Sequence, residues 1–221
     1  DFGQFLIEEL EIARNEDPER VPEIQEETVK VLKAGKDACA GVKSALEPEI
    51  EDQQKKINYG LMWMKGAVLT REQAKADKEN RGVLVSRAVE DLEEMVLYFG
   101  EESALGLRGL FEIAQCYEVQ GDMDEAVLWY TDTIDQIVRS LQGAVDGEID
   151  LTPEMAGFLF GMMQEVYVRA GETMAREGAD GTAELFTNFR GHIESFGEEG
   201  VDIFDVVSEG YGHLMLLAES R

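Results

Sequence analysis

The stretch that decides the fold is LRGLFEIAQCYEVQGDMDEAVLWYTDTIDQIVRS, residues 107–140. Its first half carries apolar residues three and four positions apart, namely Leu110, Ile113, Ala114 and Tyr117. Side chains with that spacing share one face of an α-helix. A second stripe of the same kind follows, namely Ala126, Val127, Tyr130, Ile134, Ile137, Val138 and Leu141. The stretch therefore predicts two antiparallel amphipathic helices.

The corner between these two helices has the residues that a tight helix–helix turn needs. Gly121 can adopt the left-handed conformation that ends a helix. Asp122 can cap the next helix, and Glu125, three residues later, completes a capping box. Ser103 can cap the helix before the corner, and Thr152 with Pro153 can begin the helix that follows the stretch. Ala114 and Ala126 are small where the two helices are expected to cross, so a bulky residue at either position is expected to cost about 1–3 kcal/mol.

The spacing also resembles a known repeat. Counted from Leu107, the apolar positions 4, 7, 8, 11, 20 and 24 hold Leu110, Ile113, Ala114, Tyr117, Ala126 and Tyr130. This resembles the tetratricopeptide (TPR) pattern W-x2-L-G-x2-Y…A-x3-F in order and spacing. Residues 121–126, GDMDEA, resemble the G-x-x-x-E-A corner of that family. The resemblance implies an α-solenoid of stacked antiparallel helical hairpins and a role in protein–protein interaction.

The remaining chain is interpreted as irregular variations on this hairpin. The apolar periodicity and the Pro and Gly breaks predict further helices at Phe2–Arg14, Val21–Leu46, Glu49–Asp77, Gly82–Phe99, Pro153–Glu177, Thr182–Phe196 and Val201–Ser220. We expect an all-α, TPR-like stack of about nine helices, some of them elongated, in a single domain over residues 1–221. Its parts are N-terminal helices (1–47), a long irregular hairpin (48–100), the best repeat (103–142), a third hairpin (153–197) and a terminal helix (200–220).

Two stretches echo the best repeat. Tyr167 begins one, and the separations Gly121 to Gly178 and Ala126 to Ala183 are both 57 residues. The other echo begins at Trp63 and has longer helices. Its Ala88 falls 25 residues after the tryptophan, where the pattern expects 16.

The charge balance limits the classes of partner. The 221 residues carry 47 Asp+Glu against 20 Lys+Arg, a net charge of −27. A nucleic-acid backbone or an anionic membrane surface would be repelled. A basic partner is one interpretation of this charge, and a solubilising surface suited to a saline environment is the other.

No apolar run reaches the length of a membrane span, so we expect a soluble protein without membrane insertion. The sequence begins at Asp1, without a Met and without a leader of basic and then apolar residues. This indicates a processing site or a start inside a longer protein. Both a cytoplasmic and an exported location stay open.

The sequence gives no positive support for catalysis. It has two histidines, without the Glu-x-x-His spacing of helical metal sites, and two cysteines, Cys39 and Cys116, on apolar helix faces. No nucleophile elbow, P-loop or dinucleotide motif occurs. The acidic run of residues 146–150, DGEID, lacks the order of a calcium loop. We predict a non-enzymatic protein without a metal or cofactor.

The resemblance implies where a partner would bind. In TPR arrays, positions 2, 5, 9 and 12 of the first helices face a concave groove. The corresponding candidates are Arg108, Phe111, Gln115 and Glu118 in the best repeat, and Glu165, Val168, Glu172 and Ala175, with Arg169 beside them, in the third hairpin. This mixture departs from the Lys/Asn clamp that binds chaperone tails in the family. It favours an extended peptide or helix of a partner, with Phe111 as apolar anchor and Arg108 and Arg169 as positive contacts.

Three alternatives stay open at this stage. Phe111 can instead pack against a neighbouring hairpin. The chain can be an architectural segment of a longer superhelix, used for spacing or for assembly into homo-oligomers. It can also be a helical domain that binds a small molecule, which would require an enclosed apolar pocket with convergent polar groups.

Overall fold

The chain is built from helices stacked one after another. The computed structural model describes residues 2–46, 53–150, 152–177, 181–198, 210–213 and 215. Within these ranges all regular structure is helical, and consecutive helices pack against each other, which confirms the predicted all-α class. The elements are α1 (Phe2–Glu16), η1 (Pro18–Arg20), α2 (Val21–Leu46), α3 (Gln53–Ala76), α4 (Arg81–Phe99), α5 (Ala104–Gln120), α6 (Met123–Val145), α7 (Pro153–Glu177) and α8 (Thr182–Glu198).

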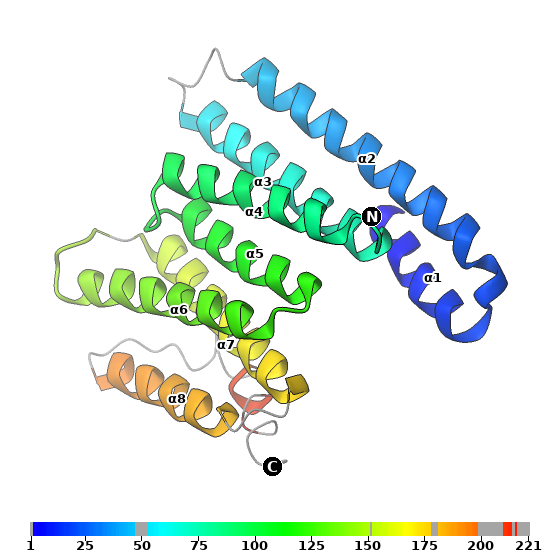
Figure 1. Ribbon diagram of the computed structural model, residues 1–221. Coiled ribbons are helices and arrows are strands. Elements are labelled where there is room, and N and C mark those ends of the chain that lie inside the picture. Colours follow the sequence, from blue (N-terminus) through cyan, green and yellow to red (C-terminus); the bar gives the residue numbers. More distant parts are fainter. Residues whose placement is uncertain are drawn as a thin grey trace. The chain divides into compact units, whose positions relative to one another are not determined.

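These helices belong to two compact units. The N-terminal unit comprises residues 1–100 and 115–121, and the C-terminal unit comprises residues 101–114 and 122–221. In the N-terminal unit α2 packs on α3 and α3 on α4, with α1 against α2 (Figure 1). In the C-terminal unit α6 packs on α7 and α7 on α8 (Figure 1). The single domain predicted over the whole chain stays a prediction.

Most helix boundaries fall within a few residues of the predicted ones. The predicted start of the third long helix, Glu49, lies outside the described residues, as does most of the terminal helix predicted at residues 200–220. Of that terminal segment, residues 210–213 and 215 are described, and they are helical. Among the described helices, none combines the length and apolar character needed to cross a membrane.

The α5–α6 hairpin has the caps that the sequence predicts. The Ser103 hydroxyl oxygen accepts a hydrogen bond from the Gly106 amide at 2.9 Å, at the start of α5. Gly121 adopts φ +92° and donates its amide to the Tyr117 carbonyl at 3.0 Å. An Asp122 carboxylate oxygen then accepts from the Glu125 amide at 3.3 Å. These bonds satisfy groups that a helix end leaves without partners, so the corner is fixed by local interactions.

The far end of α6 closes with a Schellman motif. Gly147 has φ +74°, and its amide donates to the Ala144 carbonyl at 3.2 Å. The Glu148 amide reaches back to the Gly143 carbonyl at 2.8 Å, which is the second bond of that motif. The helix therefore ends at Val145. Asp146 and Gly147, the first two residues of the acidic run 146–150, therefore cap the C-terminal end of α6.

The predicted apolar stripes form the core of the C-terminal unit. Ala114 and Ala126 are completely buried, as expected for small residues at a helix crossing. Their stripes supply further side chains with at most 6% exposure: Leu110, Ile113, Tyr130, Ile134, Ile137 and Leu141. Ala183, expected to repeat the role of Ala126, is exposed, and the neighbouring Thr182 is buried instead. The buried position at the start of α8 is therefore one residue earlier than expected.

An aromatic cluster lies in the N-terminal unit. The Trp63 ring, half-buried, meets the Tyr59 ring edge-on at 5.7 Å and the Tyr98 ring at 6.1 Å. The ammonium group of Lys43 lies 3.3 Å from the centroid of the Trp63 ring. A cation over an aromatic face is attracted by the ring quadrupole. The tryptophan therefore joins α2, α3 and α4.

Two charged residues are buried in α3. Arg71 and Glu72 are each 7% exposed, and the guanidinium of Arg71 bonds to the Glu72 carboxylate at 2.9 Å. Lys75 binds the other carboxylate oxygen at 2.8 Å. Burial alone would raise the pKa of Glu72, but the two cations outweigh burial and lower it. The carboxylate is thereby kept ionised inside the unit.

Candidate functional site

Four charged side chains form a stripe along α7. Glu165, Arg169, Glu172 and Arg176 follow one another at intervals of four, three and four residues. This spacing places all four on one face of the helix. Their signs alternate, so neighbouring side chains along the stripe carry opposite charges. We call this set the α7 stripe.

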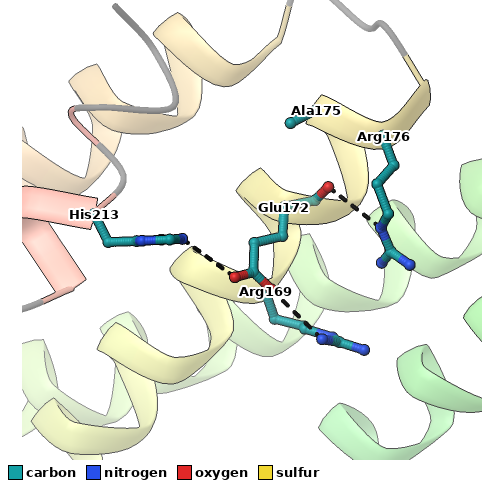
Figure 2. Close-up of a pocket in the computed structure, with 5 residues that line it drawn as sticks. All are labelled: Arg169, Glu172, Ala175, Arg176 and His213. Atoms are coloured by element: carbon teal, nitrogen blue, oxygen red, sulfur yellow. Dashed lines mark hydrogen bonds and ion pairs between the residues drawn. The ribbon is translucent and has the colours of Figure 1, made fainter. Parts of the chain in front are cut away.

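A pocket of about 500 Å³ opens at the C-terminal end of the α7 stripe (Figure 2). Its lining consists of Arg169, Glu172, Ala175, Arg176 and His213. Glu172 lies between two of these groups, with one carboxylate oxygen 3.2 Å from Nε2 of His213 and the other 3.5 Å from Nη1 of Arg169. Figure 2 shows His213 and Arg169 reaching the glutamate from opposite sides.

Arg176 lies one turn further along α7 than Glu172. Its Nε donates to the Glu172 main-chain oxygen at 3.4 Å, and its Nη2 donates to the Thr173 hydroxyl at 3.1 Å. These two contacts tie the guanidinium to its own helix beside the pocket. Arginine presents several N–H donors in a planar fork, which suits oxyanions.

A distant segment of the chain supplies His213. Gly210, in the same short helical segment, is buried, and a side-chain carbon added to it would collide with the Gln164 side chain on α7. The ring of Tyr211 packs against Phe186 at 5.0 Å and Phe189 at 6.4 Å, both on α8. Residues 210–213 thus pack closely on α7 and α8. This packing brings the imidazole to Glu172.

Arg108 connects the α7 stripe to α5. Its Nη1 bonds to the Glu165 carboxylate at 2.7 Å, and its Nε bonds to the Glu112 carboxylate at 3.1 Å. Glu112 is only 5% exposed. Arg108 and Glu165 are 57 residues apart, the same separation that relates the best repeat to the similar stretch beginning at Tyr167. Positions that the sequence treats as equivalent are therefore in contact.

The expected apolar anchor is not available at the surface. Phe111 is 2% exposed, and its ring packs against Tyr130 of α6 at 5.6 Å, with the Arg108 guanidinium 4.8 Å from the ring centroid. The expectation of an exposed Phe111 is therefore wrong. The side chain points to the second helix of its own hairpin, because α5 needs a large apolar group there to fill the α5–α6 contact.

The other predicted positions have mixed outcomes. Gln115, Glu118 and Val168 are half-buried. Gln115 and Glu118 lie in the part of α5 that belongs to the N-terminal unit. Glu165, Arg169 and Glu172 come together with Arg108 along α5 and α7, as described above. Sequence reasoning missed Arg176, which continues the helical spacing of the stripe, and His213, for which no sequence signal exists.

Positively charged side chains are scarce in the C-terminal half of the chain. Residues 101–221 contain 25 Asp+Glu, six Arg and no Lys. We call the surface formed by Arg108 and the α7 stripe the α5–α7 face. Three of the six arginines nevertheless lie on this face, namely Arg108, Arg169 and Arg176, and His213 lies beside them. Charge-assisted hydrogen bonds from guanidinium groups are among the stronger polar contacts in proteins. The arrangement can therefore bind an anionic group locally while the surroundings stay acidic.

A second group of ionisable side chains lies between α6, α7 and α8. Tyr167 is 2% exposed and stacks on the Phe189 ring at 4.5 Å, with the His192 ring at 6.2 Å. Burial, and to a smaller degree the charge of Asp135, raises the pKa of Tyr167. Burial lowers the pKa of His192, although Asp135 opposes this effect. Tyr167 therefore belongs to the core of the unit and His192 is half-buried beside it, and burial favours the neutral form of both rings.

Within the described residues, no three His, Cys, Asp or Glu side chains are grouped so that they could hold a metal ion. Cys39 and Cys116 are both buried thiols. Comparisons of the chain with protein-family models, with curated proteins and with solved structures find no match.

Proposed function

We propose that the protein is a non-enzymatic, TPR-like interaction module that binds a peptide or helix of a protein partner along the α5–α7 face. The binding surface consists of Arg108 and the α7 stripe, and the pocket at His213 lies at its end. The buried Phe111 does not belong to this surface, so recognition depends on charge and hydrogen bonding rather than on an apolar anchor.

One observation carries this proposal. Half of the arginines of a strongly acidic region gather on one face, where they are arranged with Glu165 and Glu172 in alternating order. Such an array offers complementary contacts to a segment that carries both signs of charge. The acidic surroundings favour a partner with a net positive charge.

The shape of the pocket favours a partner segment over a small molecule. The pocket is open, and among the described residues that line it only Ala175 lacks a charged or ionisable side chain. Small-molecule sites are usually concave and mostly apolar, and they cover most of the ligand. A pocket that is open to solvent instead suits an extended chain that crosses it.

Selection of peptides from a random library tests the proposal. Peptides of about 12 residues, roughly 40 Å when extended, are long enough to follow α7. The purified protein serves as bait, and the Kd of the selected peptides is measured by fluorescence polarisation. We expect the double variant Arg169→Glu/Arg176→Glu to weaken binding at least about tenfold, because two charge-assisted contacts become repulsive.

The matched control is Arg139→Glu/Arg190→Glu, which changes the net charge equally but acts on exposed arginines of α6 and α8. It should leave the Kd within about twofold, since both side chains are exposed and neither belongs to the proposed binding surface. Equal weakening by both double variants would indicate bulk charge and contradict the assignment of the face. A concentration-dependent homo-oligomer in ultracentrifugation would favour the architectural alternative.

A further inference from the structure

The pocket at the end of the α7 stripe combines three nitrogen-bearing side chains with one carboxylate. Arg169 and His213 contact the carboxylate of Glu172 at 3.5 Å and 3.2 Å, and Arg176 lies one turn further along the same face. The Glu172 side chain is 38% exposed, so its carboxylate is not locked in a core. An exposed ion pair of this kind contributes little to stability and exchanges readily with competing ions.

The position of Glu172 resembles that of a bound anion. Its two oxygens accept from donors on opposite sides, as the oxygens of a carboxylate or phosphate ligand would. The cavity beside it, about 500 Å³, is far larger than one carboxylate needs. The side chain therefore occupies one end of the pocket and leaves room for a group that could take its place.

Building on the proposed function, we propose that this pocket is an oxyanion site in which Glu172 is the resident anion and is displaced by a carboxylate or phosphate group of the partner segment. Arg169, Arg176 and His213 are the donors. On binding, the incoming oxyanion takes the contacts of Glu172 with Arg169 and His213, and the glutamate turns to solvent. No covalent step is involved.

The acidic surroundings explain why such a site would use an internal anion. In a region with 25 carboxylates and six arginines, cations without a fixed counter-ion would attract other acidic side chains. Glu172 supplies a counter-ion in a defined geometry, three residues from Arg169 on the same helix. Glu172 also makes the pocket selective, because an incoming anion must bind Arg169 and His213 more tightly than the glutamate does.

The test measures binding of glutarate and of inorganic phosphate, each at constant ionic strength set with sodium chloride. Binding is followed by calorimetry and by NMR of the arginine Nε–Hε groups, with Arg169 and Arg176 assigned from their Lys variants. Glu172→Gln removes the charge of the resident anion and should tighten binding about three- to tenfold, because no internal carboxylate competes. Arg169→Gln and Arg176→Gln should each abolish binding of the probe.

The control is Glu184→Gln, which removes one exposed carboxylate of α8 and should leave the affinity unchanged. Affinity in Glu172→Gln that equals or falls below that of Glu184→Gln would overturn the displacement. Identical NMR shifts with chloride alone would overturn the site, since they would reflect screening. A preference for glutarate would identify a side-chain carboxylate as the natural group, and a preference for phosphate would identify a phosphorylated residue.

These probes are small ions, so the outcome is independent of peptide selection. Failure to select peptides, together with tighter anion binding by Glu172→Gln, would contradict the interaction module and leave the oxyanion site standing. Successful selection of peptides, with the affinity for small anions unchanged by Glu172→Gln, would support the interaction module and contradict the oxyanion site.

Discussion

At the scale of single residues, Phe111 shows how a position can change its role between sequence and structure. Its ring is 2% exposed and packs on Tyr130. Phe111→Ala should lower the free energy of unfolding by about 3–5 kcal/mol, the usual cost of removing a buried phenylalanine. Urea denaturation followed by circular dichroism measures this change.

Phe158→Ala is the matched control, because Phe158 is 41% exposed on α7. Its loss should change stability by less than about 1 kcal/mol, since little burial is lost. Similar effects of the two substitutions would mean that Phe111 is not in the core, and the original interpretation as an anchor would return.

His192 predicts a pH dependence of stability. Its pKa is lowered in the folded state by burial. The unfolded chain therefore binds a proton more readily than the folded protein does, and stability is lost as the pH falls through about 6.5, the ordinary histidine pKa. Urea denaturation between about pH 7.5 and pH 5.5 should show a smaller decrease for His192→Gln than for the natural sequence.

The net effect of carboxylate protonation is common to both proteins, so only the difference between them reports on His192. A slope that is unchanged in His192→Gln would show that the imidazole titrates alike in the folded and unfolded chain.

At the scale of elements, the ends of the helices were predictable because local chemistry determines them. Ser103, Asp122 and Thr152 each accept a hydrogen bond from the amide three residues later, as their side chains and positions indicate. α7 begins at Pro153, which suits the first turn of a helix. Interactions within four or five residues are visible in the sequence, so these boundaries could be read from it.

The glycines of α6 and α7 give a prediction at the same scale. Gly147 has φ +74° in the Schellman motif, so Gly147→Ala should lower the free energy of unfolding by about 1–2 kcal/mol. Gly161 lies inside α7, where a Cβ would meet no atom of the described residues. Gly161→Ala should therefore raise stability by about 0.5–1 kcal/mol.

Thermal unfolding of the two variants measures both changes, and the same chemical substitution with opposite signs serves as an internal control. A loss of stability in Gly161→Ala would mean that α7 approaches another part of the chain more closely at that position.

At the scale of the whole molecule, charge is the property with the largest expected effect. The net charge of −27 implies repulsion among carboxylates that salt can screen. The melting temperature should rise as sodium chloride increases from about 0.05 M toward molar concentration, as the Debye length falls from about 14 Å to 3 Å. Calorimetry at several salt concentrations measures the change.

Sodium sulfate at the same ionic strength should give a similar initial rise, because screening depends on ionic strength, and a further rise where sulfate is excluded from the protein surface. A flat profile in sodium chloride would mean that the acidic faces are simply solvated.

The site was less predictable than the fold. The resemblance to the repeat pattern named Glu165 and Glu172 as candidates, with Arg169 beside them, and gave Arg108 and Glu165 the same position in their repeats. The repeat pattern alone could not decide whether the Phe111 ring is buried, because both faces of α5 carry apolar residues. Nothing near His213 in the sequence relates it to Glu172, 41 residues earlier. Contacts of that kind depend on how distant helices pack, which one sequence does not specify.

The packing of Gly210 on Gln164 has a thermodynamic consequence for the pocket. Residues 210–213 must be docked on α7 for His213 to be in place, so any ligand that contacts His213 binds the docked state better than the undocked one. By linkage, the ligand must then stabilise docking by the same factor. Amide hydrogen exchange at residues 210–213 should therefore slow when the pocket is filled. A Gly210→Val substitution, whose side chain would collide with Gln164, should weaken docking and lower the affinity of such a ligand.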